Sequence, residues 1–267
     1  MILPASYANG FAPRDGQPLY PSLWRGCVFA GTPCLGPTGL TLRDWSGYGN
    51  HGTFTNMTSE SAWSVVGGKF ALTFDGVNDY VESAQKLSSV PEVTAEAWIR
   101  TSAVSREILA IYNLAGVSIL ELYLPLSGNP QFYIYKANGS AQVCYREASV
   151  AVNDGKWHHV VGVFSGLSSR LDVYIDGLKA NGTLTGTIPS TTNTSTEPMR
   201  IGAYNSGGFF SGSIGSVRTY VIAVSDSVIR LLSSRDGIAY EMAPRRRSSS
   251  AVAAFNRRRR LLLGVSS

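Results

Sequence analysis

The chain has 267 residues, of which 44% are hydrophobic and only 15% charged, and 28 are glycine. These proportions suit a β-rich globular domain with many turns and exclude a disordered chain. The formal net charge of +5 belongs to the C-terminal end: residues 244–267 contain seven Arg and no acid, so the rest carries 5 − 7 = −2. A nearly neutral body argues against a specific nucleic-acid-binding fold, which would need a basic surface.

Residues 1–22 contain four Pro and few apolar anchors, which predicts an irregular arm. The start has no basic region followed by an apolar run, so the sequence predicts no signal peptide. No stretch approaches the ~20 apolar residues of a membrane span.

Three Cys are too few for a disulfide scaffold, although Cys27 and Cys34 are near enough in sequence to close a small loop.

Short strands separated by turn residues dominate the chain from residue 23 onward. Runs of β-branched, aromatic and alternating apolar residues predict strands, and Gly, Pro, Asn and Asp mark the turns between them. The expected strands are 23–29, 70–74, 93–101, 107–112, 117–124, 131–135, 142–146, 157–164, 170–176, 200–204 and 213–222.

The clearest element is a hairpin of the strands 157–164 and 170–176. In its second strand Leu171, Val173 and Ile175 alternate with polar or aromatic residues, which predicts one buried and one wetter face. Asp176-Gly177 predicts a tight turn, because Gly tolerates positive φ. Trp157 begins the first strand and is expected to be largely buried.

One segment carries convincing helix signals. Ser225 is an N-cap candidate, and Val228, Ile229, Leu231 and Leu232 form an apolar face that ends near Gly237. Many strands and almost no helix predict an all-β sandwich of two packed antiparallel sheets. Periodicity alone does not separate a jelly roll from an immunoglobulin-like sandwich.

Several blocks resemble laminin-G-like domains, which are concanavalin A-like jelly rolls. They occur in the family order at residues 44–53, 74–81, 93–99, 154–161 with 171–177, 199–202 and 212–218. The resemblance implies a jelly-roll β-sandwich with one short helix near the C-terminal end. It divides the chain into the arm 1–22, the domain 23–243 and an Arg-rich tail, 244–267.

Catalysis is not expected. Glucanases of this fold carry a Glu-x-Asp-x-x-Glu spacing on one strand, and the sequence contains no such triplet. Glu92 and Glu96 are the nearest acids in a strand context, with no acid between them. His158 and His159 are adjacent in a strand, so they point to opposite faces and do not easily share a metal ion.

Calcium is the weaker of two interpretations of Asp44 and Asn50. Hard oxygen ligands from this Gly-rich turn would suit the ion. In the family such a turn often faces an acid on the last strand, where this chain has Gly215-Ser216-Val217. We therefore favour an Asx-type turn closed by backbone amides and expect no cofactor. The same turn-forming role is expected for Asp75 and Asp79.

A carbohydrate contact is predicted in the Gly-rich loop that follows the strand 200–204. Tyr204, Asn205, Phe209 and Phe210 lie there at a sheet rim, where aromatic rings and an amide can stack on and bond a sugar. The alternative is that these rings close the end of the sandwich.

The resemblance therefore predicts a non-catalytic binding or adhesion module for a glycan or a protein surface. The alternative is a structural subunit of a virion or other surface assembly, whose tail docks to another subunit or to a polyanion. The docking residues would be Arg245, Arg246, Arg247, Arg257, Arg258, Arg259 and Arg260. Such a role implies a homo-oligomer or an assembly partner, and a virion or extracellular surface as the location.

Overall fold

The fold was analysed in a computed structural model that describes residues 23–112, 118–135, 143–194, 197–205 and 207–234. The predicted arm 1–22, the part of the predicted domain beyond residue 234 and the tail with its seven Arg lie outside these ranges. Among the described residues, no helix is long and apolar enough to cross a membrane.

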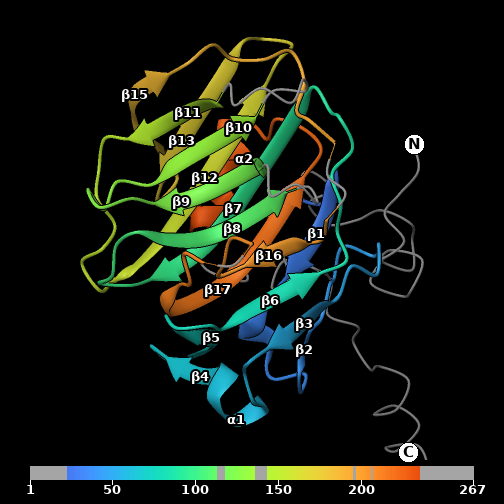
Figure 1. Cartoon of the computed structure of the whole chain (residues 1–267), viewed down its shortest axis with the longest axis vertical. Coiled ribbons are helices and arrows are strands. Elements are labelled where there is room, and N and C mark those ends of the chain that lie inside the picture. The colour runs from blue at the N-terminus through green and yellow to red at the C-terminus, as the bar shows by residue number, and fades with distance from the viewer. Residues whose placement is uncertain (1–22, 113–117, 136–142, 195–196, 206, 235–267) are drawn as a thin grey trace, which may run out of the picture.

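Two antiparallel sheets make up the body, and Figure 1 shows the larger in front of the smaller. The nine-stranded sheet has the order β15 (Asn181–Thr185), β11 (Val143–Ala148), β10 (Gln131–Tyr135), β9 (Ser118–Leu124), β8 (Arg106–Tyr112), β16 (Met199–Ile201), β6 (Tyr80–Ser83), β3 (Gly52–Thr55), β2 (Thr41–Leu42). The eight-stranded sheet has the order β14 (Leu178–Lys179), β13 (Arg170–Ile175), β12 (Trp157–Ser165), β7 (Glu92–Arg100), β17 (Ser211–Tyr220), β5 (Lys69–Asp75), β4 (Trp63–Val66), and β1 (Cys27–Gly31) also pairs with β17.

Helix is scarce in the described ranges, as predicted. There are two α-helices, α1 (Ser59–Ala62) and α2 (Asp226–Ser233), and a short 3-10 turn η3 (Pro33–Leu35). Ser225 precedes α2 in an extended conformation but makes no side-chain cap bond. The all-β sandwich of two antiparallel sheets with one short helix near the C-terminal end is confirmed.

The core fills the space between the sheets. Alternate residues of the central strands face it, among them Ala95, Ala97 and Ile99 of β7 and Leu120, Leu122 and Leu124 of β9. Gly162 of β12 is required by this packing, because a Cβ there would lie 2.1 Å from the ring of Phe132 on β10. The aromatic ring of one sheet therefore lies directly against a glycine of the other.

The central hairpin is confirmed, and β12 pairs with both β13 and β7. Asp176 and Gly177 both adopt positive φ, 51° and 80°, as the predicted tight turn requires. Two expectations were wrong. Trp157 is only partly buried, because it lies at the end of its strand. The second face of β13 is not wetter: Tyr174 is 1% exposed, because α2 packs over it.

A second apolar cluster joins α2 to the outer face of the eight-stranded sheet. Its members are Leu23, Trp24, Cys27, Ala30, Val161, Val163, Tyr174, Tyr220, Val224, Ile229 and Leu232. The Cys27 thiol belongs to this cluster and donates to the Phe29 carbonyl, so it is not bridged to Cys34. Burial raises the pKa of the Cys27 thiol far above its usual range, which makes it an unreactive packing group.

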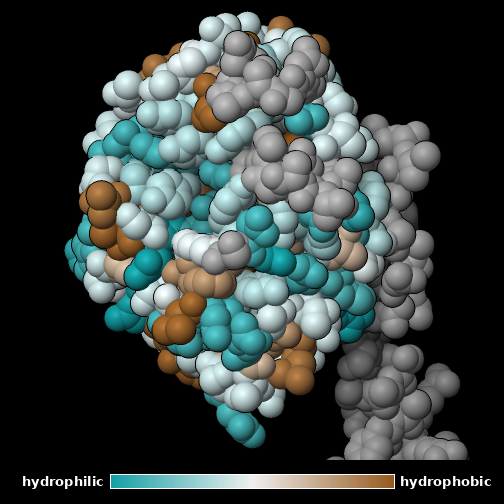
Figure 2. All heavy atoms as spheres, in the orientation of Figure 1, coloured by the Kyte–Doolittle hydropathy of each residue, from teal (hydrophilic) through white to brown (hydrophobic). Residues whose placement is uncertain are grey.

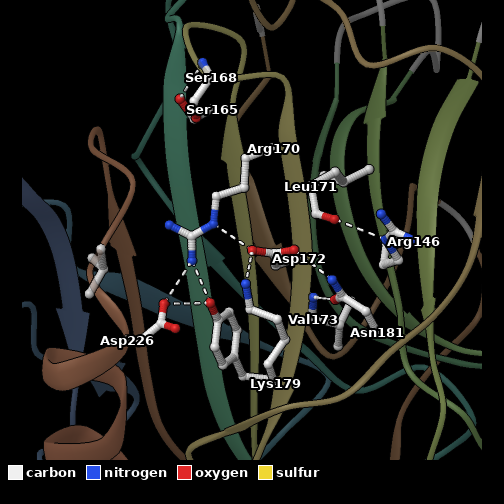
Figure 3. Close-up of polar contacts among 12 residues, drawn as sticks. Arg146, Ser165, Ser168, Arg170, Leu171, Asp172, Val173, Lys179, Asn181 and Asp226 are labelled. Carbon is white, nitrogen blue, oxygen red and sulfur yellow. Dashed lines mark hydrogen bonds and ion pairs between the residues drawn. The ribbon is translucent and has the colours of Figure 1, made fainter.

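Polar contacts surround this cluster where β13 meets α2 (Figure 3). Asp226, at the first position of α2, accepts hydrogen bonds from Tyr174 Oη at 2.7 Å and from Arg170 Nη2 at 3.1 Å. Asp172 pairs with Arg170 and Lys179 and accepts from Asn181 Nδ2 at 2.6 Å. Each of these drawn groups has a protein partner, so the network is structural.

Boundaries are where prediction and structure differ. The strand expected at 200–204 ends at Ile201, and the one expected at 23–29 begins only at Cys27. Sequence reasoning missed the short strands β2, β3, β4, β6, β14 and β15 as separate elements, and it missed α1. These elements contain two to five residues each, too few to display a period.

Candidate functional site

A groove of about 420 Å³ opens on the outer face of the nine-stranded sheet. Because the even-numbered leucines of β9 fill the core, Glu121 and Tyr123 point outward, and the same alternation turns Tyr133 and Tyr135 of β10 outward. The lining consists of Glu107, Glu121, Tyr123, Tyr133, Tyr135, Tyr204, Gly207 and Gly208. We call it the tyrosine groove.

The face that carries the groove is mainly hydrophilic, and hydrophobic side chains appear on it in separate small groups (Figure 2). The described residues of this face therefore show no large apolar patch of the kind that marks permanent association.

Tyrosine rings are packed against one another across the strands. Tyr133 stacks on Tyr145 of β11 with ring centroids 4.6 Å apart and on Tyr135 at 6.2 Å, and it meets Tyr123 edge to face at 6.4 Å. The register explains this, because Tyr133 lies directly opposite Tyr145. Tyr133 donates to Gln131, and Tyr135 donates to Glu121 Oε2 at 3.4 Å. The rings form a packed aromatic surface that also carries hydroxyl groups.

Glu107 is the acid most deeply placed in the groove, with 3% of its surface exposed. Its amide donates to the Gly208 carbonyl at 2.7 Å, which fixes the loop after β16 against β8. Burial, and then the charge of Glu121, raise the pKa of its carboxyl well above the usual range. Oε1 has no hydrogen-bond partner among the described residues. Glu107 is thus a buried acid with one oxygen that no described residue satisfies, which is uncommon in folded proteins.

Arg200 of β16 lies beside the groove rather than among its lining residues. Its Nε is 3.1 Å from Glu82 Oε2, and its guanidinium lies over the rings of Tyr80, at 4.4 Å, and Tyr112, at 5.4 Å. Burial raises the pKa of Tyr112 to about 12, although Arg200 opposes this. The cation is already held by an acid and two rings.

Three of the four residues predicted to contact sugar lie on or near this surface. Tyr204 lines the groove and meets Tyr112 edge to face at 5.7 Å. Asn205 is exposed and its carbonyl accepts from Arg200, while Phe209 is half-buried. The predicted sugar contact is wrong for Phe210. This residue is fully buried and packs edge to face on Phe74 at 6.0 Å, so its ring belongs to the core.

Asp44 and Asn50 form a closed turn. The Asp44 carboxylate accepts from the amides of Ala30 at 2.9 Å, Ser46 at 2.8 Å and Asn50 at 2.9 Å, and from Ser46 Oγ at 2.8 Å. The Asn50 side chain donates to the Val28 carbonyl at 3.0 Å. Hydrogen-bond donors thus surround the carboxylate oxygens that calcium would need.

Asp75 and Asp79 also bond within their own turn. Asp75 Oδ1 accepts from the Val77 amide at 2.8 Å, and Asp79 Oδ2 accepts from the Asp75 amide at 3.1 Å. Within the part of the chain that the structure describes, no group of three or more His, Cys, Asp or Glu side chains is placed to hold a metal ion.

His159 and Glu96 lie on the outer face of the eight-stranded sheet, away from the groove. His159 Nε2 is 3.1 Å from Glu96 Oε2, and its ring stacks on Trp98 at 5.2 Å. Burial raises the pKa of Glu96, but ion pairing with Arg218 and bonding to His159 outweigh it and hold that pKa below its usual range. Glu92 accepts from Ser165 Oγ at 2.8 Å. Both Glu96 and Glu92 are therefore bonded to other residues of the protein and have a structural role.

The two adjacent histidines differ in burial, in keeping with their expected opposite directions. His159 is fully buried, whereas His158 reaches Asp176 Oδ2 at 2.8 Å and Asp154 Oδ1 at 3.0 Å at the surface. The lowered pKa of Asp154 comes mainly from bonds with Lys156, and His158 adds to it. His158 therefore fastens two turns together.

Sequence reasoning missed Glu107, Glu121, Tyr123, Tyr133, Tyr135 and Tyr145. A signal was present, because the strands 118–124 and 131–135 each place polar or aromatic residues at alternate positions. What the pattern does not give is the pairing register that brings the two strands' outward residues into one surface.

Comparison with known proteins gave one family match. A family model described as the concanavalin A-like lectin/glucanases superfamily matches residues 75–230. That range includes β6–β17 and every lining residue of the tyrosine groove. No curated protein matches the chain.

Solved structures share the fold at low identity. Domain 4 of an extracellular GH43 arabinanase from Geobacillus stearothermophilus, in complex with arabinotriose, is 17% identical with a TM-score of 0.58, over 78% of this chain and 98% of that one. Trypanosoma rangeli sialidase is 15% identical with a TM-score of 0.54, over 80% of this chain and 33% of that one. The receptor-binding domain of botulinum neurotoxin type G is 14% identical with a TM-score of 0.53, over 78% and 51%.

Proposed function

The chain belongs to the concanavalin A-like lectin/glucanase superfamily, and from that premise we propose that it is a non-catalytic binding module whose ligand is a carbohydrate. The observation that carries the proposal is the tyrosine groove on the nine-stranded sheet. The arabinanase domain that shares the fold was solved with arabinotriose, which supports the same class of ligand.

The groove has the composition that sugar binding needs. Tyrosine rings offer flat apolar faces for the C–H surface of a pyranose or furanose, and their hydroxyls bond its polar rim. The stacked Tyr133, Tyr135 and Tyr145 hold one another in place, so little side-chain freedom would be lost on binding. A volume of about 420 Å³ corresponds to a small-molecule pocket.

The test is a glycan screen of the full chain followed by titration of each hit against variants. Tyr123→Ala and Tyr204→Ala each remove a groove ring, and we expect each to weaken binding at least roughly fivefold. Tyr48→Ala is the matched control, because Tyr48 is 59% exposed in the Asp44 turn and does not line the groove. Equal affinity of all three variants and the parent would place the ligand elsewhere.

Glycoside hydrolysis is a second candidate, because the groove contains two carboxyl groups, Glu107 and Glu121, and the pKa of Glu107 is raised. A raised pKa suits a general acid, and a second carboxyl group is what glycosidases use as base or nucleophile. We favour binding, because the sequence lacks the Glu-x-Asp-x-x-Glu spacing of glucanases. Release of reducing ends from a bound oligosaccharide, lost in both Glu107→Gln and Glu121→Gln, would decide for the enzyme.

A protein-surface ligand and a structural role in a virion or surface assembly remain alternatives. The former gains some support from the toxin receptor-binding domain of similar fold. The latter depends on the Arg-rich tail, which lies outside the described residues. A sizing experiment that finds the full chain assembled, combined with a glycan screen without hits, would favour the assembly.

A further inference from the structure

Glu107 gives the tyrosine groove a chemical preference that its rings alone do not have. Its carboxyl lies on β8 beside Glu121 and Tyr123 of β9, and it is almost completely buried. The ionisable side chains that share the groove with it are Glu121, Tyr123, Tyr133, Tyr135 and Tyr204. No Lys, Arg or His is among the described residues of the lining.

These surroundings favour the protonated form of the Glu107 carboxyl and raise its pKa well above the usual range. Burial disfavours its ionised form, and the negative charge of Glu121 adds to this. A protonated carboxyl has one O–H donor as well as acceptor capacity. Since Oε1 has no partner among the described residues, this group can bond a ligand without first breaking a bond to any of them.

We propose that the tyrosine groove selects saccharides whose bound residue is uncharged, with the buried and unpartnered Glu107 carboxyl bonding a hydroxyl of that residue and Glu121 excluding sugars that carry a carboxylate. The inference rests on the proposed function and deepens it by naming the substrate class. A sugar hydroxyl both donates and accepts, so it matches a protonated carboxyl in either direction.

Acidic sugars meet the opposite situation. A sialic acid or uronate would bring a second negative charge close to Glu121 in a partly water-excluded groove, where like charges repel strongly. Arg200 does not compensate, because it lies outside the lining and is paired with Glu82. The negative charge of Glu121 should therefore lower the affinity for acidic sugars relative to neutral ones.

The experiment uses the full chain and matched pairs of glycans that differ by one acidic group, such as lactose against sialyllactose and glucosides against glucuronides. The neutral member of each bound pair should bind at least roughly tenfold more tightly. Glu121→Gln should reduce this preference, whereas Glu60→Gln, which removes one exposed charge on α1, should leave it unchanged.

Two variants of Glu107 test its role directly. Binding to the parent chain should weaken as pH rises through the raised pKa of Glu107, and Glu107→Gln, which keeps a donor and an acceptor but cannot ionise, should remove that pH dependence. Glu107→Leu places a side chain of similar size but without a donor in the groove, and affinity should fall about tenfold. Thermal melts of both variants confirm that the fold is intact.

The outcomes separate the two proposals. If acidic and neutral partners bind alike, or if Glu107→Leu binds as the parent does while Tyr123→Ala does not, this inference is wrong and carbohydrate binding stands. If no glycan in the screen binds the parent chain, the proposed function fails, and the inference fails with it.

Discussion

Burial of the Glu107 carboxyl couples folding of this chain to pH. Its pKa is raised in the folded state above the unfolded value near 4.5, so the native chain holds this proton where the unfolded chain has released it. The resulting stability is complete below pH 4.5 and is lost progressively as pH rises toward the folded pKa. Glu107 should therefore lower the free energy of unfolding at neutral pH relative to an uncharged side chain of the same shape.

Replacing this acid should therefore stabilise the protein. Glu107→Gln removes the ionisable group and should raise the free energy of unfolding at pH 7–8 by about 1–3 kcal/mol, with little change near pH 4. Urea denaturation across that pH range measures it. The expected sign is specific, because Glu60→Gln at the surface should change stability by less than ~0.5 kcal/mol at either pH. A variant less stable than the parent at pH 8 would show that Glu107 is ionised and paired.

Asp44 supports a prediction about calcium. Its carboxylate already accepts four hydrogen bonds from donors of its own turn and of β1, so a cation would have to displace them. We expect millimolar calcium to leave the melting temperature unchanged, since a ligand that binds only the native state would raise it. Asp44→Ala should lower stability with or without the ion. A rise with calcium that the variant abolishes would contradict this expectation.

At the scale of elements, the contact between β12 and β10 depends on Gly162. A methyl group there would lie 2.1 Å from the Phe132 ring, and both residues are in the middle of packed strands. Gly162→Ala should cost about 1–3 kcal/mol by overpacking, measured by denaturant unfolding. Gly207→Ala is the control, because nothing lies within 4 Å of its Cβ position. Phe132→Leu in the same chain as Gly162→Ala should restore part of the loss.

Helix α2 is held mainly by its apolar face. Ile229 is fully buried against the eight-stranded sheet, so Ile229→Ala should cost about 2–4 kcal/mol. Asp226 bonds Arg170 and Tyr174, but its side chain is about half exposed, at 52%, so Asp226→Ala should cost only ~0.5–1 kcal/mol. Unfolding curves of the two variants rank the two contributions. A larger loss of stability for Asp226→Ala would show that the polar contacts, and not the apolar face, hold α2 in place.

The same elements show what the sequence could and could not predict. The hairpin of β12 and β13 was predictable, because its turns and alternation are strong and local. The burial of Tyr174 was not, since it depends on α2, which is distant in sequence. Phe210 failed for the same reason: a ring in a Gly-rich loop can point to solvent or to the core, and only the position of Phe74 decides. The groove required the register of four strands, which alternation alone does not fix.

For the whole molecule, the uneven charge supports a prediction about the Arg-rich tail. Seven Arg in a segment without acids, attached to a body of formal charge −2, should bind polyanions with an affinity that falls steeply as salt rises. The full chain should be retained on heparin more strongly than a chain ended at Pro244. Sizing of both forms tests subunit docking in parallel. Identical behaviour in both assays would leave the tail without either role.

The position of β17 has a consequence for how the chain is made. This late strand lies between β7 and β5 and also pairs with β1, where Cys27 is opposite Tyr220. On a ribosome that releases residues in order, β1 and β5 therefore leave the exit tunnel long before their common neighbour exists. Their unpaired edges must be tolerated or shielded during that interval, and the eight-stranded sheet closes only after β17 has emerged. A contact of such sequence separation also makes refolding slow for a domain of this size.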